Sequence, residues 1–123
     1  MLLICPNRAT SVELRGVPSQ EMAAWEILDS ERYPEPQSFA ELLVSAKPQL
    51  CFLDVCSAPD QAERVLAQLA RPPANIPVIA LLSRNEPELI LRFLRRGAAT
   101  FLLRPFTAKQ LKAAIDKVAV LFP

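Results

Sequence analysis

Residues 50–54 read Leu-Cys-Phe-Leu-Asp, a short apolar run that ends in a single carboxylate. Continuous apolar runs of this length are typical of parallel strands that are buried on both faces. Similar runs occupy residues 2–5, 76–82 and 100–103, and a weaker run occupies residues 25–28. The sequence therefore predicts five strands, with Asp54 at the end of the third.

Amphipathic helical patterns separate these runs. The first is expected at residues 8–24, although Gly16 and Pro18 interrupt it. Ser38, with Glu41 three residues later, has the pattern of a capping box for a second helix that ends at Lys47. The remaining helices are expected at residues 60–70, from Ser83 or Asn85 to Gly97, and from Thr107 onward. This alternation predicts an α/β fold, a doubly wound five-stranded parallel sheet with helices on both faces.

The composition excludes several classes of protein. A length of 123 residues with 51% hydrophobic residues fits one domain, expected to span residues 1–123. Two glycines and no histidine exclude glycine-rich phosphate loops and most hydrolase triads and zinc sites, so no enzyme is expected. The net charge of +1 gives no reason to expect nucleic acid as a partner of the chain by itself, and no apolar run is long enough for a membrane span.

The three cysteines, Cys5, Cys51 and Cys56, lack CxxC spacing. A reducing, cytoplasmic setting is the simplest expectation for such a chain. Cys5 and Cys56 follow strand runs and are expected near Asp54, which allows either redox sensing or a soft-metal site. Without histidine, buried inert thiols are the better interpretation, and no metal site is expected.

The second half of the chain carries a recognisable pattern: Pro77, then Gly97-Ala98, then Arg104-Pro105-Phe106-Thr107. This spacing, together with residues 50–55, resembles the response-regulator receiver domain, a flavodoxin-like fold of two-component signal transduction. The resemblance covers nearly the whole chain, is specific from residue 49 to 118 and is weaker from residue 8 to 37. It implies a role in a bacterial phosphorelay, in which Asp54 matches the phosphoacceptor.

The residues around that aspartate depart from the family's pattern. Cys5 and Pro6 stand where the family has two acidic ligands for Mg²⁺, and neither is a good ligand for that ion. Leu82, followed by Ser83, stands where the family has a hydroxyl residue. Phe101 stands at the family's aromatic switch position, and Arg104 stands where the family has a lysine. The resemblance therefore implies a pseudo-receiver with no cofactor and a degenerate phosphorylation site. In it, Asp54 is expected to be exposed and to pair with Arg104. A working phosphoacceptor at Asp54 is the alternative.

The family's usual partner surface runs from the fourth to the fifth of its helices. Here it would carry mixed charge from Arg92, Arg95, Arg96, Lys109, Lys112 and Asp116. These charges could form a solvated face or a nucleic-acid stripe, but an interface with protein partners, including an ion-paired homodimer, is the expectation. Residues 85–98 also resemble receiver-like domains at the N-terminus of MinD-type pilus-assembly ATPases. That resemblance implies that residues 120–123 begin a linker to a further domain.

Overall fold

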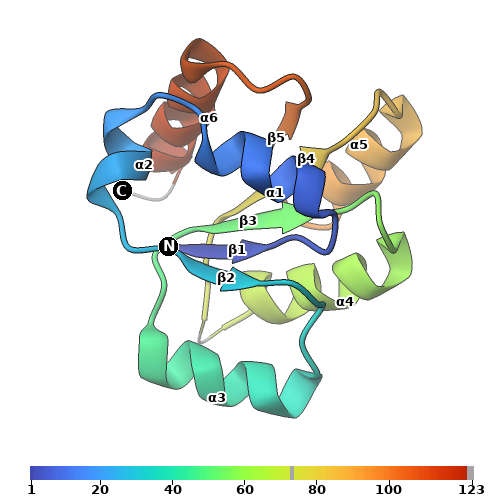
Figure 1. Cartoon of the computed structure of the whole chain (residues 1–123). Coiled ribbons are helices and arrows are strands. Elements are labelled where there is room, and N and C mark those ends of the chain that lie inside the picture. Colours follow the sequence, from blue (N-terminus) through green and yellow to red (C-terminus); the bar gives the residue numbers. More distant parts are fainter. Residues whose placement is uncertain (73, 122–123) are drawn as a thin grey trace.

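The computed structural model describes residues 1–72 and 74–121, in which five parallel strands form one sheet (Figure 1). The order β2-β1-β3-β4-β5 confirms the predicted doubly wound topology. The strands are β1 (Leu2–Ile4), β2 (Leu28–Ser30), β3 (Cys51–Asp54), β4 (Val78–Leu82) and β5 (Thr100–Leu103). β1, β3 and β4 are buried along their whole length, which explains why their sequences are continuous apolar runs.

Helices cover both faces of this sheet (Figure 1). They are α1 (Arg8–Arg15), α2 (Gln20–Ala24), α3 (Pro36–Ala46), α4 (Pro59–Ala70), α5 (Pro87–Arg95) and α6 (Ala108–Leu121). Residues of α3, α4 and α5 pack with Leu53 in one apolar cluster, and residues of α1, α2 and α6 pack with Phe52 in the other. Successive residues of β3 thus point to opposite layers.

The segment predicted as one helix over residues 8–24 is in fact two helices. The N–H of Gly16 donates to the carbonyl of Val12 and ends α1, and Pro18 follows. Ser19 then caps α2 by accepting the N–H of Met22 at 3.3 Å. Because α2 extends to Ala24, β2 begins at Leu28, three residues later than predicted.

Three predicted helix starts were also wrong. α3 begins with Pro36 rather than after Ser38, and α4 begins with Pro59 rather than Asp60. α5 begins with Pro87 after Glu86, so neither Ser83 nor Asn85 is its N-cap. In all three helices proline takes a first-turn position, where its missing N–H removes no helical hydrogen bond.

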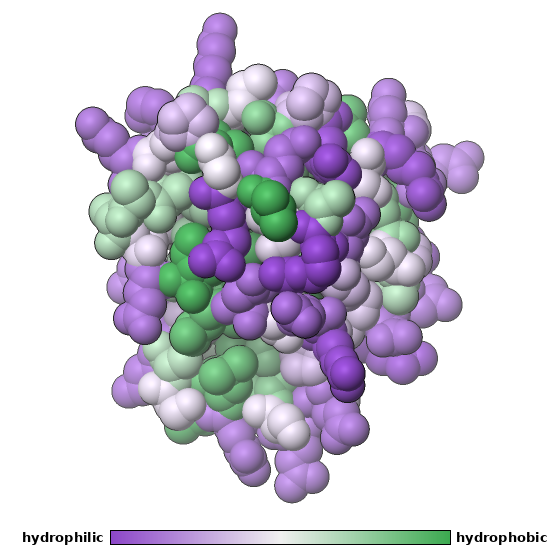
Figure 2. Space-filling model, viewed as in Figure 1, coloured by the Kyte–Doolittle hydropathy of each residue, from purple (hydrophilic) through white to green (hydrophobic). Residues whose placement is uncertain are grey.

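Among the described residues no helix is long and apolar enough to cross a bilayer. Figure 2 shows a mostly hydrophilic face, with apolar side chains gathered in small separate patches. The carboxyl ends of β1, β3 and β4 meet at one edge of the sheet, which places Asp54 between the β1–α1 and β4–α5 loops. This edge is where ligand sites of such sheets lie.

Candidate functional site

Asp54 is the last residue of β3, and its side chain is surrounded by hydrogen-bond donors. Its Oδ1 accepts the backbone N–H groups of Cys56 at 3.0 Å and Ser57 at 3.3 Å. Its Oδ2 accepts the backbone N–H of Asn7 at 3.3 Å and the hydroxyl of Ser57. The residue is 1% exposed, so the prediction of an exposed carboxylate was wrong. The carboxylate instead joins the β1–α1 loop to the β3–α4 loop.

Arg104 does not pair with Asp54, contrary to the prediction. Its guanidinium lies 3.3 Å from Oε1 of Glu13 on α1, and its Nη1 donates to Oγ1 of Thr10 at 3.4 Å. The second oxygen of Glu13 accepts the backbone N–H of Phe106 at 3.0 Å. Glu13 therefore binds the arginine that was predicted to pair with Asp54. No ion pair within residues 1–72 and 74–121 includes Asp54.

A thiol completes the surroundings of this carboxylate. The Cys5 Sγ lies 3.8 Å from Oδ2 of Asp54 and 3.1 Å from the carbonyl oxygen of Asn7. Burial, together with the charge of Asp54, raises the pKa of the Cys5 thiol to about 12. The thiol is therefore a protonated donor and not a nucleophile at neutral pH. Cys51 and Cys56 are likewise buried and free.

These donors do not suit Mg²⁺, which prefers several carboxylate and water oxygens in an octahedral array. The end of β1 supplies a thiol and a proline. Oδ1 of Asp54 already accepts two donors, and Oδ2 accepts two donors besides the Cys5 thiol. In the described part of the chain no three side chains of histidine, cysteine, aspartate or glutamate gather into a metal site.

Solved structures match the fold and curated proteins match the sequence, although no protein-family model matches the chain. The signal receiver domain of a DNA-binding response regulator from Colwellia psychrerythraea aligns with a TM-score of 0.69 at 20% identity, over 97% of this chain and 96% of that one. A putative two-component response regulator/GGDEF domain protein aligns with a TM-score of 0.72 at 17% identity, over 99% of this chain and 49% of that one. The fold is that of a response-regulator receiver domain.

Curated response regulators are also similar to this chain in sequence. The phosphate regulon transcriptional regulatory protein PhoB of Pseudomonas aeruginosa is 27% identical over 119 residues, 95% of the chain and 50% of that protein. The probable C4-dicarboxylate response regulator DctR of Halalkalibacterium halodurans is 28% identical over 76 residues, 62% of the chain and 33% of that protein. The chain thus spans between a third and a half of the length of these relatives.

The other residues that the resemblance marks as altered lie at the same edge of the sheet or beside it. Leu82 ends β4 fully buried, and Ser83 follows it half-buried. Phe101 on β5 is 37% exposed, whereas its neighbours Thr100 and Leu102 are buried. An apolar Leu82 gives the site no hydroxyl from the last residue of β4.

Sequence reasoning missed three residues that shape the site: Ser57, Glu13 and Tyr33. The hydroxyl of Tyr33, in the β2–α3 loop, donates to the backbone carbonyl oxygen of Asp54. Burial raises the pKa of Tyr33, and the nearby charge of Asp54 adds to the effect, so the phenol stays protonated. None of the three carried a local signal, because each reaches its partner only through the arrangement of the folded chain.

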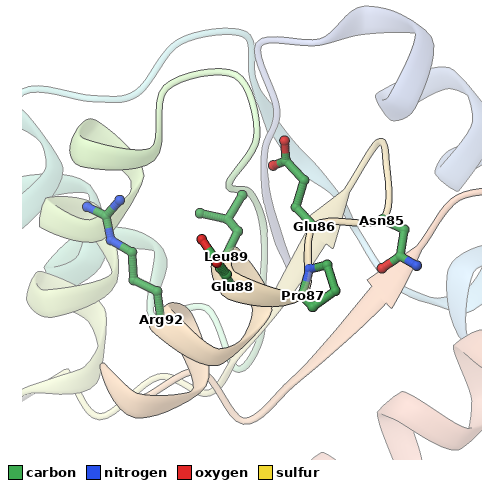
Figure 3. A pocket seen from close by; sticks show the side chains of 6 residues that line it. All are labelled: Asn85, Glu86, Pro87, Glu88, Leu89 and Arg92. Atoms are coloured by element: carbon green, nitrogen blue, oxygen red, sulfur yellow. The ribbon is translucent and has the colours of Figure 1, made fainter.

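A surface depression of about 690 Å³ lies at the start of α5, next to the β3–α4 loop that follows Asp54 (Figure 3). Figure 3 shows Arg92 at one end, Asn85 at the other, and Glu86, Glu88 and Leu89 between them. Oε1 of Glu86 is paired with Arg84 at 2.6 Å, and its Oε2 faces the buried Cys56 thiol at 3.9 Å.

The predicted interaction residues fall into two groups. Arg92 and Arg96 bind acidic residues of α4 within the chain: Arg92 contacts Asp60 at 2.8 Å and Glu63 at 3.0 Å, and Arg96 contacts Glu63 at 2.9 Å. The others, Arg95, Lys109, Lys112 and Asp116, are exposed, and Lys112 pairs with Asp116 at 3.1 Å within α6. The surface available to a partner is therefore less basic than the sequence suggested.

Proposed function

We propose that this chain is a pseudo-receiver in bacterial signal transduction, which binds protein partners without phosphorylation of Asp54. The observation that supports this most directly is the set of four donors around the Asp54 carboxylate. They give the carboxylate a structural task, which is to hold two loops together. A group with that task is poorly placed to act as a nucleophile.

Phosphoryl transfer depends on free access to the attacking oxygen and on cations that neutralise the phosphoryl oxygens. Asp54 is 1% exposed, and each of its oxygens already accepts at least two hydrogen bonds. The cation at the family's lysine position, Arg104, is bound to Glu13. Transfer to Asp54 would require the loss of the Ser57 hydroxyl contact and would bring a dianion into a site without a free cation.

The alternative is a working phosphoacceptor at Asp54. The two are separated by incubating the protein with Mg²⁺ and acetyl phosphate, with a phosphorylatable receiver domain in a parallel reaction. Intact-mass spectrometry should show no adduct on this chain, and beryllofluoride should leave its amide resonances unchanged. A stoichiometric adduct that peptide mapping places on Asp54, and that Asp54→Asn abolishes, would refute the proposal.

The partner surface we propose is the α5–β5–α6 face, defined by Leu91, Arg95, Phe101 and Lys109. Leu91 is 50% exposed and Phe101 is 37% exposed, so two large apolar side chains face solvent on neighbouring elements. Apolar and aromatic groups ringed by charges are typical of protein interfaces. A homodimer through this face is the simplest form of such contact.

Sedimentation velocity tests the homodimer. Leu91→Glu or Arg95→Glu should shift self-association to higher protein concentration, by about tenfold if either side chain is central to the contact. Val44→Glu is the matched control, because Val44 is 73% exposed on α3, away from this face. A wild-type protein that stays monomeric at high micromolar concentration contradicts the homodimer, and equal behaviour of all variants contradicts this face.

The proposal includes an output or ATPase domain in the same polypeptide, as the resemblance to MinD-type pilus-assembly ATPases implies. Its support is limited to that resemblance and to the length of the relatives, of which the chain covers 33% and 50%. Sequencing the gene downstream of the codon for Pro123 tests this part directly. A stop codon at that point refutes it.

A further inference from the structure

Glu13 on α1 accepts three hydrogen bonds from the β5–α6 loop. One oxygen, Oε1, accepts both Nε and Nη2 of Arg104 at 3.3 Å. The other, Oε2, accepts the backbone N–H of Phe106 at 3.0 Å. With the bond from Arg104 to Thr10, four hydrogen bonds join α1 to residues 104–106.

This cluster is shielded enough for its hydrogen bonds to fix a conformation. Thr10 is 1% exposed, and the side chains of Glu13 and Arg104 are 31% and 28% exposed. The ring of Phe106 is buried in the apolar cluster that α1 and α6 share. The N–H of Phe106 also lowers the pKa of Glu13, so the carboxylate is ionised at neutral pH. A charged acceptor makes the stronger kind of hydrogen bond.

We infer that Glu13 is a positioning residue, which holds Arg104 and the β5–α6 loop in one conformation while Asp54 carries no added group. The inference rests on the proposed function, because that loop joins β5 to α6 and so sets the α5–β5–α6 face. Glu13 supplies within the chain the negative group that Arg104 binds. The face is then kept permanently in one state instead of responding to a modification of Asp54.

The same geometry explains why arginine suits this position better than lysine. The guanidinium reaches Oε1 of Glu13 with two nitrogens and Thr10 with the third. A lysine ammonium is a single point of charge and cannot span both acceptors in this way. Arg104→Lys is therefore expected to loosen the loop, but less than loss of Glu13 does.

Amide hydrogen exchange measured by NMR tests the inference. In Glu13→Ala the amide of Phe106 should exchange about tenfold faster, since its acceptor is gone. The amides of Asn7, Cys56 and Ser57, which donate to Asp54, should keep their wild-type rates. Glu41→Ala on α3, which removes an exposed glutamate, should leave all four rates unchanged.

A second readout separates positioning from simple loss of a contact. The resonances of Phe101 and Lys109, which lie outside the Glu13 contacts, should shift in Glu13→Ala and return partway in Glu13→Gln, which keeps an acceptor oxygen. If Glu13→Ala does not fold, Glu13→Gln and Arg104→Lys carry the same test with smaller expected changes.

Two results would overturn the inference. One is an unchanged exchange rate for Phe106, and the other is faster exchange of Phe106 without any shift at Phe101 and Lys109. Failure of the proposed function gives a different result. Phosphorylation of Asp54 is detected as an increase in mass, and it does not change the exchange rates measured on the unmodified protein.

Discussion

Replacing Asp54 by alanine tests whether its carboxylate is structural. The substitution removes the acceptor for three backbone N–H groups, of which that of Cys56 is fully buried and those of Asn7 and Ser57 are partly buried. An unsatisfied buried amide costs about 2 kcal/mol, and a partly buried one that recovers water costs roughly 0.5 kcal/mol. We therefore expect Asp54→Ala to lower the free energy of unfolding by about 3 kcal/mol.

Asp54→Asn should cost less, roughly 1–2 kcal/mol, because its remaining oxygen still accepts two amides while its NH₂ group meets the N–H of Asn7. Urea unfolding followed by the fluorescence of Trp25, the single tryptophan, gives both values. Asp116→Ala is the control. Among the described residues this exposed carboxylate bonds to Lys112 alone, and its loss should cost about 0.5 kcal/mol or less. An Asp54→Ala protein as stable as the wild type, or more stable, would show that the carboxylate is not a structural link.

Three further predictions concern single groups. The Oγ of Ser11 is buried with no hydrogen-bond partner among the described residues. Ser11→Ala should therefore stabilise the protein by about 1 kcal/mol and raise Tm by roughly 4 °C in calorimetry. An unchanged or lower Tm contradicts this prediction. Burial raises the pKa of Cys5 to about 12, so little thiolate forms at pH 8 and Ellman's reagent should label Cys5 only after unfolding in urea. Fast labelling that peptide mapping places on Cys5 in the native protein refutes its burial. Hydrogen bonds from Arg8 hold the pKa of Asp29 below its ordinary value of 3.8, so the stability that the Asp29 carboxylate contributes is present above pH 3.8 and is lost as the pH falls below it. The free energy of unfolding of Asp29→Asn should therefore depend less on pH in this range. An identical pH profile for variant and wild type contradicts the assignment.

The strands were predictable because burial on both faces leaves a direct trace in the sequence. Residues 51–54 and 78–82 are apolar almost without interruption, and their order follows from the handedness of the crossovers. The position of β2 was not predicted correctly, because Leu28 and Asp29 lie exposed at the sheet edge and no apolar run marks them. The strand was instead predicted at the weaker apolar run over residues 25–28.

The partner of Arg104 was not predictable from the sequence. Both Asp54 and Glu13 are carboxylates at the correct end of the sheet, and the choice between them depends on the rotation of α1 about its axis. Thr10 and Glu13 lie three residues apart on one side of α1, and both contact the β5–α6 loop. Three amides and a hydroxyl then satisfy Asp54, an arrangement that depends on loop conformation and has no motif.

The contacts of Glu63 with Arg92 and Arg96 affect how fast a partner could bind. Long-range attraction between opposite charges accelerates encounter, and dissolved salt weakens it. Arg92 and Arg96 are already paired with Glu63 of α4, which leaves Leu91, Arg95, Phe101 and Lys109 of this face free to contact a partner. Association at this face should therefore proceed at an ordinary rate that changes little with ionic strength, and selectivity should come from the fit of apolar shapes after the two surfaces meet.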